Sequence, residues 1–201
     1  MYKRQGAYAA PATRALPTAP RESVEQRDRK QTAMMIGFPI VTAAHPDWPA
    51  MRILQSLTSG LSGTFFAELR GRQSLAYTVF VRPQSFAQRG VFTAYLAGEA
   101  SKEERARAAL LAEIRKLQGE GVREDDLARA KAYYAGTTRL NRESNASLAA
   151  EYGGNYILGL PLDSVDRILA AVPGLTVKDL QRVAREQLSG DNYVYAAVRG
   201  K

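Results

Sequence analysis

Arg70 and Tyr77, seven residues apart, are two side chains of this sequence whose types could do catalytic chemistry. A tyrosine phenol can donate a hydrogen bond to an oxyanion as its negative charge develops. An arginine guanidinium offers five donors in a planar fork and can hold carbonyl or carboxylate oxygens. Spacing alone favours a plainer interpretation, in which Tyr77 is a half-buried strand residue and Arg70 complements the dipole at a helix C-terminus.

Metal ligands are scarce in this sequence, which has no cysteine and a single histidine, His45. A catalytic zinc site uses about three protein ligands drawn from histidine, cysteine and carboxylates. We therefore expect no metal site and no cofactor in this chain. His45 lies between an alanine and a proline in a predicted loop, without an evident nucleophile to serve, so we interpret it as an exposed bystander.

The elements that must position Arg70 and Tyr77 can be predicted from hydrophobic periodicity. An apolar run at 32–40 predicts a buried strand, and alternation at 75–81 and 90–97 predicts an antiparallel pair. A short helix through Phe65 and Leu69 should end near Gly71, where a glycine permits a left-handed cap. Arg70 would then lie on the last helical turn and Tyr77 at the start of the following strand.

Segments before and after these strands have apolar residues at helical spacing. Helices are expected at about 47–58, 101–118, 124–145, 147–157, 163–171 and 177–188, with a closing strand at 193–198. Ser101 with Glu104 and Thr176 with Asp179 have the spacing of N-terminal caps. The order of elements predicts an α+β fold, a mainly antiparallel sheet with helices packed on one face.

Within the helices, Leu127, Tyr134 and Leu140 are expected to face inward. The aromatic pairs Tyr133 with Tyr134 and Tyr152 with Tyr156 are interpreted as core packing, with a surface against a partner as the alternative. The segment 59–63 is Gly- and Ser-rich but lacks the Lys-Ser/Thr of a phosphate loop, so it predicts a turn between helices.

The N-terminal residues differ in character from the rest. Residues 1–5 match the translation of a sequencing adapter, and 7–29 are rich in proline, alanine and charge without apolar periodicity. We expect residues 1–29 to be an adapter scar and interdomain linker, and 30–201 to form one domain. On this interpretation the natural start is missing and the chain is a fragment.

The sequence resembles one family in four segments, which are the strand at 32–40, the turn at 59–63, the Arg70/Tyr77 segment and the helix at 177–188. They are similar to the C-terminal, zinc-free domain of the pitrilysin/insulinase-like metallopeptidases, which include the mitochondrial processing peptidases. The resemblance implies one half of a clam-shell fold that closes around peptides or unfolded segments. Tyr77 would stabilise the oxyanion and Arg70 would bind substrate.

The same resemblance implies where zinc comes from. The family's His-x-x-Glu-His motif is absent from this sequence, so the zinc is expected in an N-terminal half or a partner subunit of similar fold. This chain should then be inactive alone. The alternative is a non-catalytic structural subunit of the same fold in a larger assembly.

Charge suggests a third class, a basic nucleic-acid-binding module, because 28 Lys and Arg against 20 Asp and Glu give a formal charge of +8. The basic residues are scattered, however, so we favour a solvated surface and no nucleic-acid partner. No apolar run is long enough to predict a membrane span. Arg- and Ala-rich usage is typical of GC-rich bacteria, and the sequence leaves periplasm and cytoplasm equally open.

Overall fold

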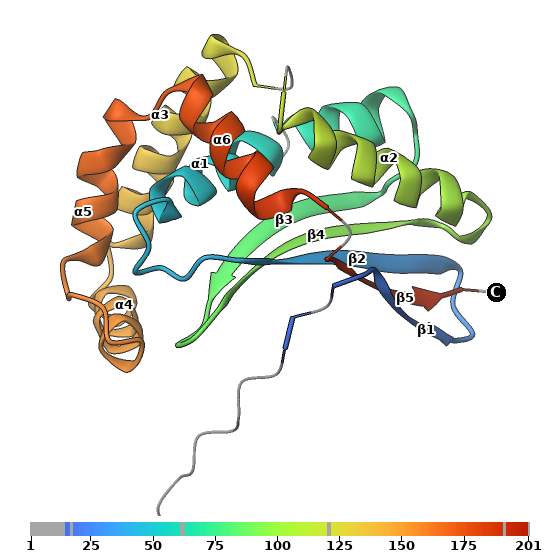
Figure 1. The fold of residues 1–201 in the computed structure, drawn as a ribbon, viewed down its shortest axis with the longest axis horizontal. Coiled ribbons are helices and arrows are strands. Elements are labelled where there is room, and N and C mark those ends of the chain that lie inside the picture. Colours follow the sequence, from blue (N-terminus) through green and yellow to red (C-terminus); the bar gives the residue numbers. More distant parts are fainter. Residues whose placement is uncertain (1–14, 17, 61–62, 120–121, 191, 201) are drawn as a thin grey trace, which may run out of the picture.

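The computed structural model describes residues 15–16, 18–60, 63–119, 122–190 and 192–200. Its strands are β1 (Arg21–Gln26), β2 (Gln31–Ile40), β3 (Thr78–Ser85), β4 (Gly90–Glu99) and β5 (Val194–Arg199). They form one sheet in the order β1-β5-β2-β4-β3, in which every pair is antiparallel except β1 with β5. The helices lie on one face of this sheet (Figure 1), which confirms the predicted α+β class.

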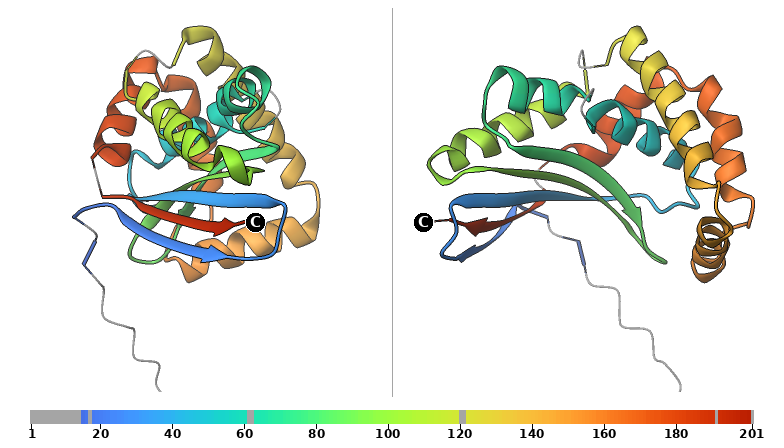
Figure 2. Two further views of the ribbon diagram at one scale, coloured as in Figure 1. Left: turned by 90° about the vertical axis from the view of Figure 1, so that its right-hand side faces the viewer. Right: turned by 180° about the vertical axis from the view of Figure 1, so that it is seen from behind.

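Six α-helices and three shorter helical segments occur in the described chain, two of them between β2 and β3 and the others between β4 and β5. The α-helices are α1 (Trp48–Thr58), α2 (Glu103–Lys116), α3 (Glu124–Asn141), α4 (Asn145–Ile157), α5 (Ser164–Ala171) and α6 (Val177–Leu188). The shorter segments are the π-helix η1 (Phe66–Arg72) and the 3-10 helices η2 (Ala100–Lys102) and η3 (Val172–Gly174). Figure 2 shows the same two layers from the side and from behind.

The core lies between the sheet and the helices. Along β2, Met34, Ile36 and Phe38 are buried while the intervening residues are half-buried or exposed. This period of two directs one face of the strand toward α1 and α6. The N-terminus of α6 is fixed as predicted, because Thr176 Oγ1 accepts from the Asp179 N–H at 3.2 Å and Asp179 Oδ2 accepts from the Thr176 N–H at 2.8 Å.

β1 corrects the expectation that residues 7–29 lack regular structure. All six of its residues are exposed, so no apolar periodicity could have revealed it. Backbone hydrogen bonds to β5 hold the strand, and Glu22 forms a 2.9 Å ion pair with Arg107 of α2. The sheet therefore extends to residues before 30, and the division between linker and domain stays a prediction.

Local turn chemistry was predicted wrongly at two places. The left-handed backbone expected at Gly71 occurs instead at Ser74, whose φ is 51°. Ser101 does not cap α2, because the chain enters that helix through η2 and the N-cap residue is Lys102 without a side-chain hydrogen bond. In the turn at 59–63, Leu61 and Ser62 lie outside the described residues.

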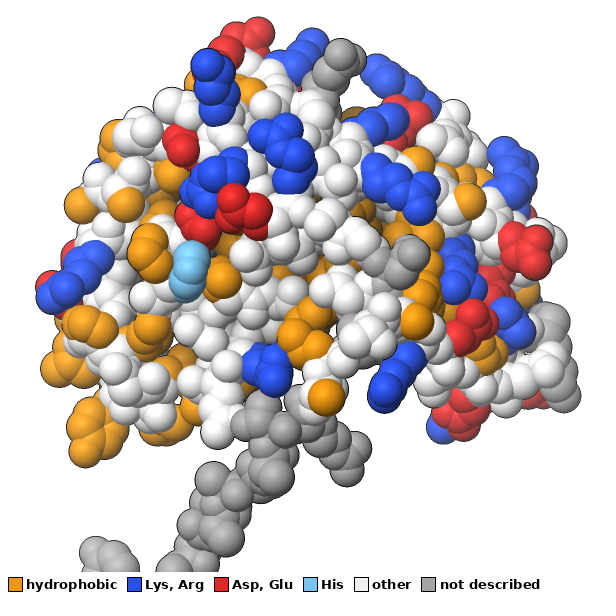
Figure 3. Space-filling model, viewed as in Figure 1, with side chains coloured by type: hydrophobic (Ala, Val, Ile, Leu, Met, Phe, Trp, Pro, Cys, Tyr) orange, Lys and Arg blue, Asp and Glu red, His pale blue; other side chains and the backbone are white. Residues whose placement is uncertain are grey.

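Several apolar side chains predicted to be in the core are on the surface. Tyr134 is buried as expected, but Leu140 is 63% exposed and Tyr156 is 81% exposed, and Tyr133 and Tyr152 are also exposed. On the face drawn in Figure 3, hydrophobic side chains gather over α4 and the nearby end of α5, whereas basic side chains are interspersed with acidic ones.

The face of the sheet opposite the helices carries no helix in the described part of the chain (Figures 1 and 2). Met35 is 40% exposed there, and Phe80 stacks on Tyr95 with their ring centroids 4.7 Å apart. Met35, Tyr95 and Phe80 are partners across β2, β4 and β3, and neighbouring exposed apolar side chains of this kind are typical of a contact with another protein unit. No described helix is long and apolar enough to cross a membrane.

Candidate functional site

Arg70 and Tyr77 are positioned by the passage from η1 into β3. Leu69 of η1 is buried, so the π-helix is anchored while the Arg70 side chain beside it is exposed. The chain then passes close over β4, where a Cβ on Gly98 would lie 2.3 Å from the Leu75 carbonyl oxygen. Only glycine tolerates this approach, which fixes the backbone just before Tyr77.

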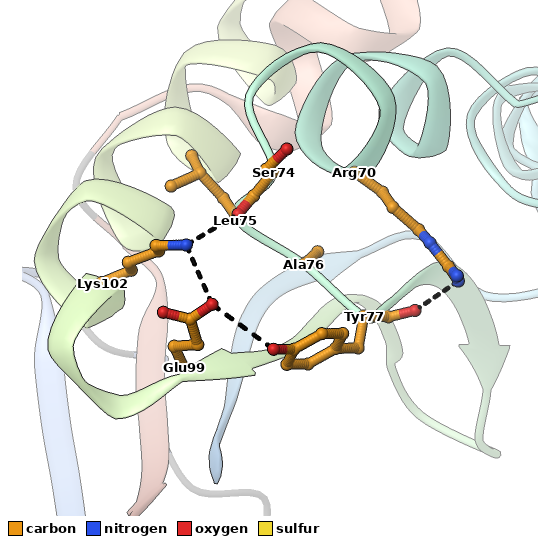
Figure 4. A pocket seen from close by; sticks show the side chains of 7 residues that line it. All are labelled: Arg70, Ser74, Leu75, Ala76, Tyr77, Glu99 and Lys102. Atoms are coloured by element: carbon orange, nitrogen blue, oxygen red, sulfur yellow. Dashed lines mark hydrogen bonds and ion pairs between the residues drawn. The ribbon is translucent and has the colours of Figure 1, made fainter.

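Both residues line one cavity of about 270 Å³. Figure 4 shows it between η1, the start of β3 and the end of β4, with Ser74, Glu99 and Lys102 around it. The structure thus brings the two predicted site residues to the same surface hollow.

The Arg70 guanidinium is held by the backbone of its predicted partner. Its Nη1 donates to the Tyr77 carbonyl oxygen at 2.7 Å, and its Cζ lies 5.0 Å from the centroid of the Phe66 ring. These contacts use one of five guanidinium donors, and the side chain remains exposed. The remaining donors are available to a ligand in the cavity.

The Tyr77 phenol points away from the guanidinium, toward the end of β4 (Figure 4). Its hydroxyl lies 3.4 Å from Glu99 Oε1, at the long end of the hydrogen-bond range. The side chain is 50% exposed. The two groups therefore share a cavity but diverge within it.

Glu99 and Lys102 belong to this cavity and were not identified from the sequence. Lys102 Nζ donates to Glu99 Oε1 at 2.9 Å and lies 3.4 Å from the Ser74 carbonyl oxygen. The Lys102 ammonium lowers the pKa of the Glu99 carboxyl, with a smaller contribution from the Tyr77 hydroxyl. The available signal was their spacing of three residues at the end of a predicted strand, which is common on protein surfaces.

The outer edge of β3 is closed by side chains. Ser59 Oγ accepts from the Val81 N–H at 2.7 Å and donates to the Val81 carbonyl at 3.0 Å, while Arg70 covers the Tyr77 carbonyl. Pro83 has no N–H to offer. A peptide in this region would therefore meet side chains in the cavity more readily than it would add as a strand to β3.

The described residues contain no group of three His, Cys, Asp or Glu side chains that could hold a metal ion. His45 is exposed, and its Nδ1 accepts from the Asp47 N–H at 3.2 Å. The Asp47 carboxylate is itself held by Arg182, which lowers the pKa of Asp47 through its hydrogen bond. These residues do not fit a catalytic zinc site.

Comparison with known proteins relates this chain to a family of protein domains. The model of the peptidase M16 inactive domain matches residues 5–134. An uncharacterized zinc protease of Streptomyces coelicolor is 27% identical over 197 residues, which cover 93% of this chain and 43% of that protein. A Helicobacter pylori protein named a non-peptidase homolog is 21% identical over 182 residues, covering 90% of this chain and 42% of that protein.

The fold agrees with a solved structure of the same description. The crystal structure of a peptidase M16 inactive domain from Pseudomonas fluorescens matches 98% of this chain and 47% of that chain, with a TM-score of 0.86 and 21% identity. The chain thus spans less than half the length of the two curated relatives above.

Proposed function

Because this chain belongs to the family of the peptidase M16 inactive domain, we propose that it is the half of a zinc-dependent peptidase that binds substrate and completes the active site. The observation that carries the proposal is the shared cavity of two exposed side chains, Arg70 with unused donors and Tyr77 with a hydroxyl held only by a long contact to Glu99. The substrates are peptides or unfolded segments. Zinc supplies the metal chemistry from another half, in the same polypeptide or on a partner subunit.

Tyr77 is assigned to oxyanion stabilisation. Its contact with Glu99 is long at 3.4 Å, so little is lost when the phenol turns to a developing negative charge. The ionised Glu99 carboxylate accepts but cannot donate, and Lys102 keeps it ionised through its hydrogen bond. The Tyr77 hydroxyl therefore donates to Glu99 in the absence of substrate, and this weak bond is given up when the phenol donates to an oxyanion.

Arg70 is assigned to substrate binding. The Tyr77 carbonyl and the Phe66 ring hold its guanidinium in place before a substrate arrives. Such preorganisation limits the side-chain entropy lost when a peptide carbonyl or carboxylate binds. The remaining donors then orient the substrate relative to Tyr77.

The partner is a zinc-bearing half of similar fold. The exposed apolar side chains of Met35 and Phe80, with Tyr95 stacked on Phe80, support a contact with another unit of this kind. No described group of side chains could replace that partner as the metal site.

A second function, a non-catalytic structural subunit of the same fold, is supported by the relative that is named a non-peptidase homolog. Under it, the cavity at Arg70 and Tyr77 would take no part in any reaction. The two functions differ in whether the assembled protein cleaves a substrate once a zinc-bearing half is supplied.

The experiment combines this chain with a zinc-bearing half, as one polypeptide or as two chains, and follows cleavage of an unfolded protein with and without a chelator. The proposal expects cleavage that needs both halves and stops on chelation. An assembled complex without chelator-sensitive cleavage would contradict it and favour the structural subunit.

A further inference from the structure

A cavity of about 340 Å³ lies between α1 and α3, separate from the one that Arg70 and Tyr77 line. Its volume falls within the range of small-molecule sites. Helix α1 contributes Arg52 and Gln55 to the lining, and α3 contributes Thr138 and Asn141. Among the described residues that line it there is no aspartate or glutamate.

The cavity arises from two polar stripes. On α1 the lining positions are 52, 55 and 56, with Ser59 directly after the helix, and on α3 they include 134, 137, 138 and 141. Each set follows the spacing of one helical face. Two helices that pack together in a domain normally face each other with apolar side chains, so polar stripes on both are unusual and leave an open, hydrophilic space.

The Arg52 guanidinium has no counter-ion in the described structure. It forms none of the ion pairs found there, and its one described side-chain contact is with Tyr134, whose ring centroid lies 5.7 Å from its Cζ. Tyr134 is buried, so the ring is a fixed support for the guanidinium. A half-buried, oriented cation without a carboxylate is suited to recognise an anion.

Some polar groups of the lining are already engaged, and others are free. Ser56 Oγ donates to the Arg52 carbonyl at 3.2 Å, and Thr137 Oγ1 donates to the Tyr133 carbonyl at 2.8 Å. By contrast, the side-chain amides of Gln55 and Asn141 form no hydrogen bond with any described residue. These amides can both donate and accept, which suits a ligand that carries N–H groups beside its charge.

We propose that this cavity binds one carboxylate of a peptide, either its C-terminal carboxylate or an acidic side chain, through Arg52. The planar guanidinium matches the two oxygens of a carboxylate in bidentate fashion. Gln55 and Asn141 contact the adjacent peptide group. The site is distinct from Arg70 and Tyr77, and its occupancy does not depend on peptide cleavage.

Charge balance selects a carboxylate over a phosphate. Arg52 is the only cation among the described lining residues. A carboxylate has one negative charge, whereas a phosphate group has about 1.5 to 2 at neutral pH and usually recruits several cationic donors. One guanidinium therefore neutralises the first ligand but not the second.

The test titrates the ¹⁵N-labelled chain by NMR with three N-acetylated tripeptides and with inorganic phosphate. One peptide is trialanine with a free C-terminal carboxylate, the second is its C-terminal amide, and the third has a central glutamate and an amidated end. Arg52→Gln is compared with Arg105→Gln, which removes the same charge from an exposed position of α2.

We expect the carboxylate peptides to shift amide signals of α1 and α3, with binding at least about tenfold weaker in Arg52→Gln and unchanged in Arg105→Gln. Binding of the first peptide alone assigns the chain terminus, and binding of the third alone assigns an acidic side chain. Equal binding of the neutral amide, tighter binding of phosphate, or no effect of Arg52→Gln would overturn the proposal. The comparison of peptides on the unmutated chain stands even if a variant fails to fold.

Discussion

Glu103 is the best place to test whether hydrogen bonds buried beside the sheet determine the stability of this domain. At the start of α2, its carboxylate accepts from the Tyr195 hydroxyl at 2.9 Å and from Arg199 Nε at 2.8 and 2.9 Å. Tyr195 is fully buried, and burial together with the Glu103 hydrogen bond raises the pKa of its phenol. Glu103→Ala would leave that phenol without an acceptor.

The expected loss follows from the burial of the two groups. An unsatisfied buried hydroxyl costs about 1–3 kcal/mol, and the half-exposed ion pair with Arg199 adds little. We expect Glu103→Ala to lower the free energy of unfolding by about 2–3 kcal/mol, which is roughly 1 M in the urea midpoint at an m-value of about 2 kcal/mol/M. The matched control Glu104→Ala removes an exposed carboxylate from the same helical turn and should cost no more than about 0.5 kcal/mol.

Urea unfolding followed by fluorescence measures this directly, because the single tryptophan, Trp48, is buried in the core. A double-mutant cycle identifies the cause. If the orphaned phenol dominates, Glu103→Ala combined with Tyr195→Phe should be more stable than Glu103→Ala alone. The reasoning is refuted if Glu103→Ala behaves like Glu104→Ala, or if Tyr195→Phe recovers nothing.

Two further stability predictions can use the same assay. Gly136 lies within α3, and a Cβ there would meet nothing within 4 Å. Gly136→Ala should therefore raise the free energy of unfolding by about 0.5–1 kcal/mol. A lower urea midpoint for this variant would contradict the open space at Gly136. Arg199 lowers the pKa of Glu103 in the folded state. The resulting stability is present above the carboxyl's unfolded pKa of about 4.3 and is lost as pH falls through the folded pKa. Glu103→Gln should therefore flatten the fall of the urea midpoint below about pH 4.3, and a slope equal to the wild type's would contradict this.

Helices and strands that are determined by interactions between residues close in the sequence were predictable from the sequence. The α6 helix starts at the predicted Thr176 and Asp179 cap because both hydrogen bonds are made within four residues. The alternation of β2 likewise reports its one buried face. β1 was missed since backbone pairing with β5 holds it while every residue stays exposed.

Sequence pattern singled out two residues that line one cavity, but neither the other lining residues Glu99 and Lys102 nor the arrangement of the side chains. Arg70 and Tyr77 share a cavity, yet the direction of each side chain depends on contacts that spacing cannot supply. The phenol turns toward Glu99, and the guanidinium turns toward the Tyr77 carbonyl. Tyr156 was expected in the core because helical spacing identifies a face but not whether another element covers it.

The central claim is that the Tyr77 hydroxyl acts on the transition state of peptide cleavage. Its most direct test is the steady-state kinetics of the complete zinc-bearing protein with Tyr77→Phe, beside Tyr156→Phe as a control in which an exposed phenol of α4 loses its hydroxyl. We expect Tyr77→Phe to lower kcat by about 10²-fold with KM nearly unchanged, and the control to change neither. An unchanged kcat for Tyr77→Phe in an active, zinc-dependent peptidase would contradict it.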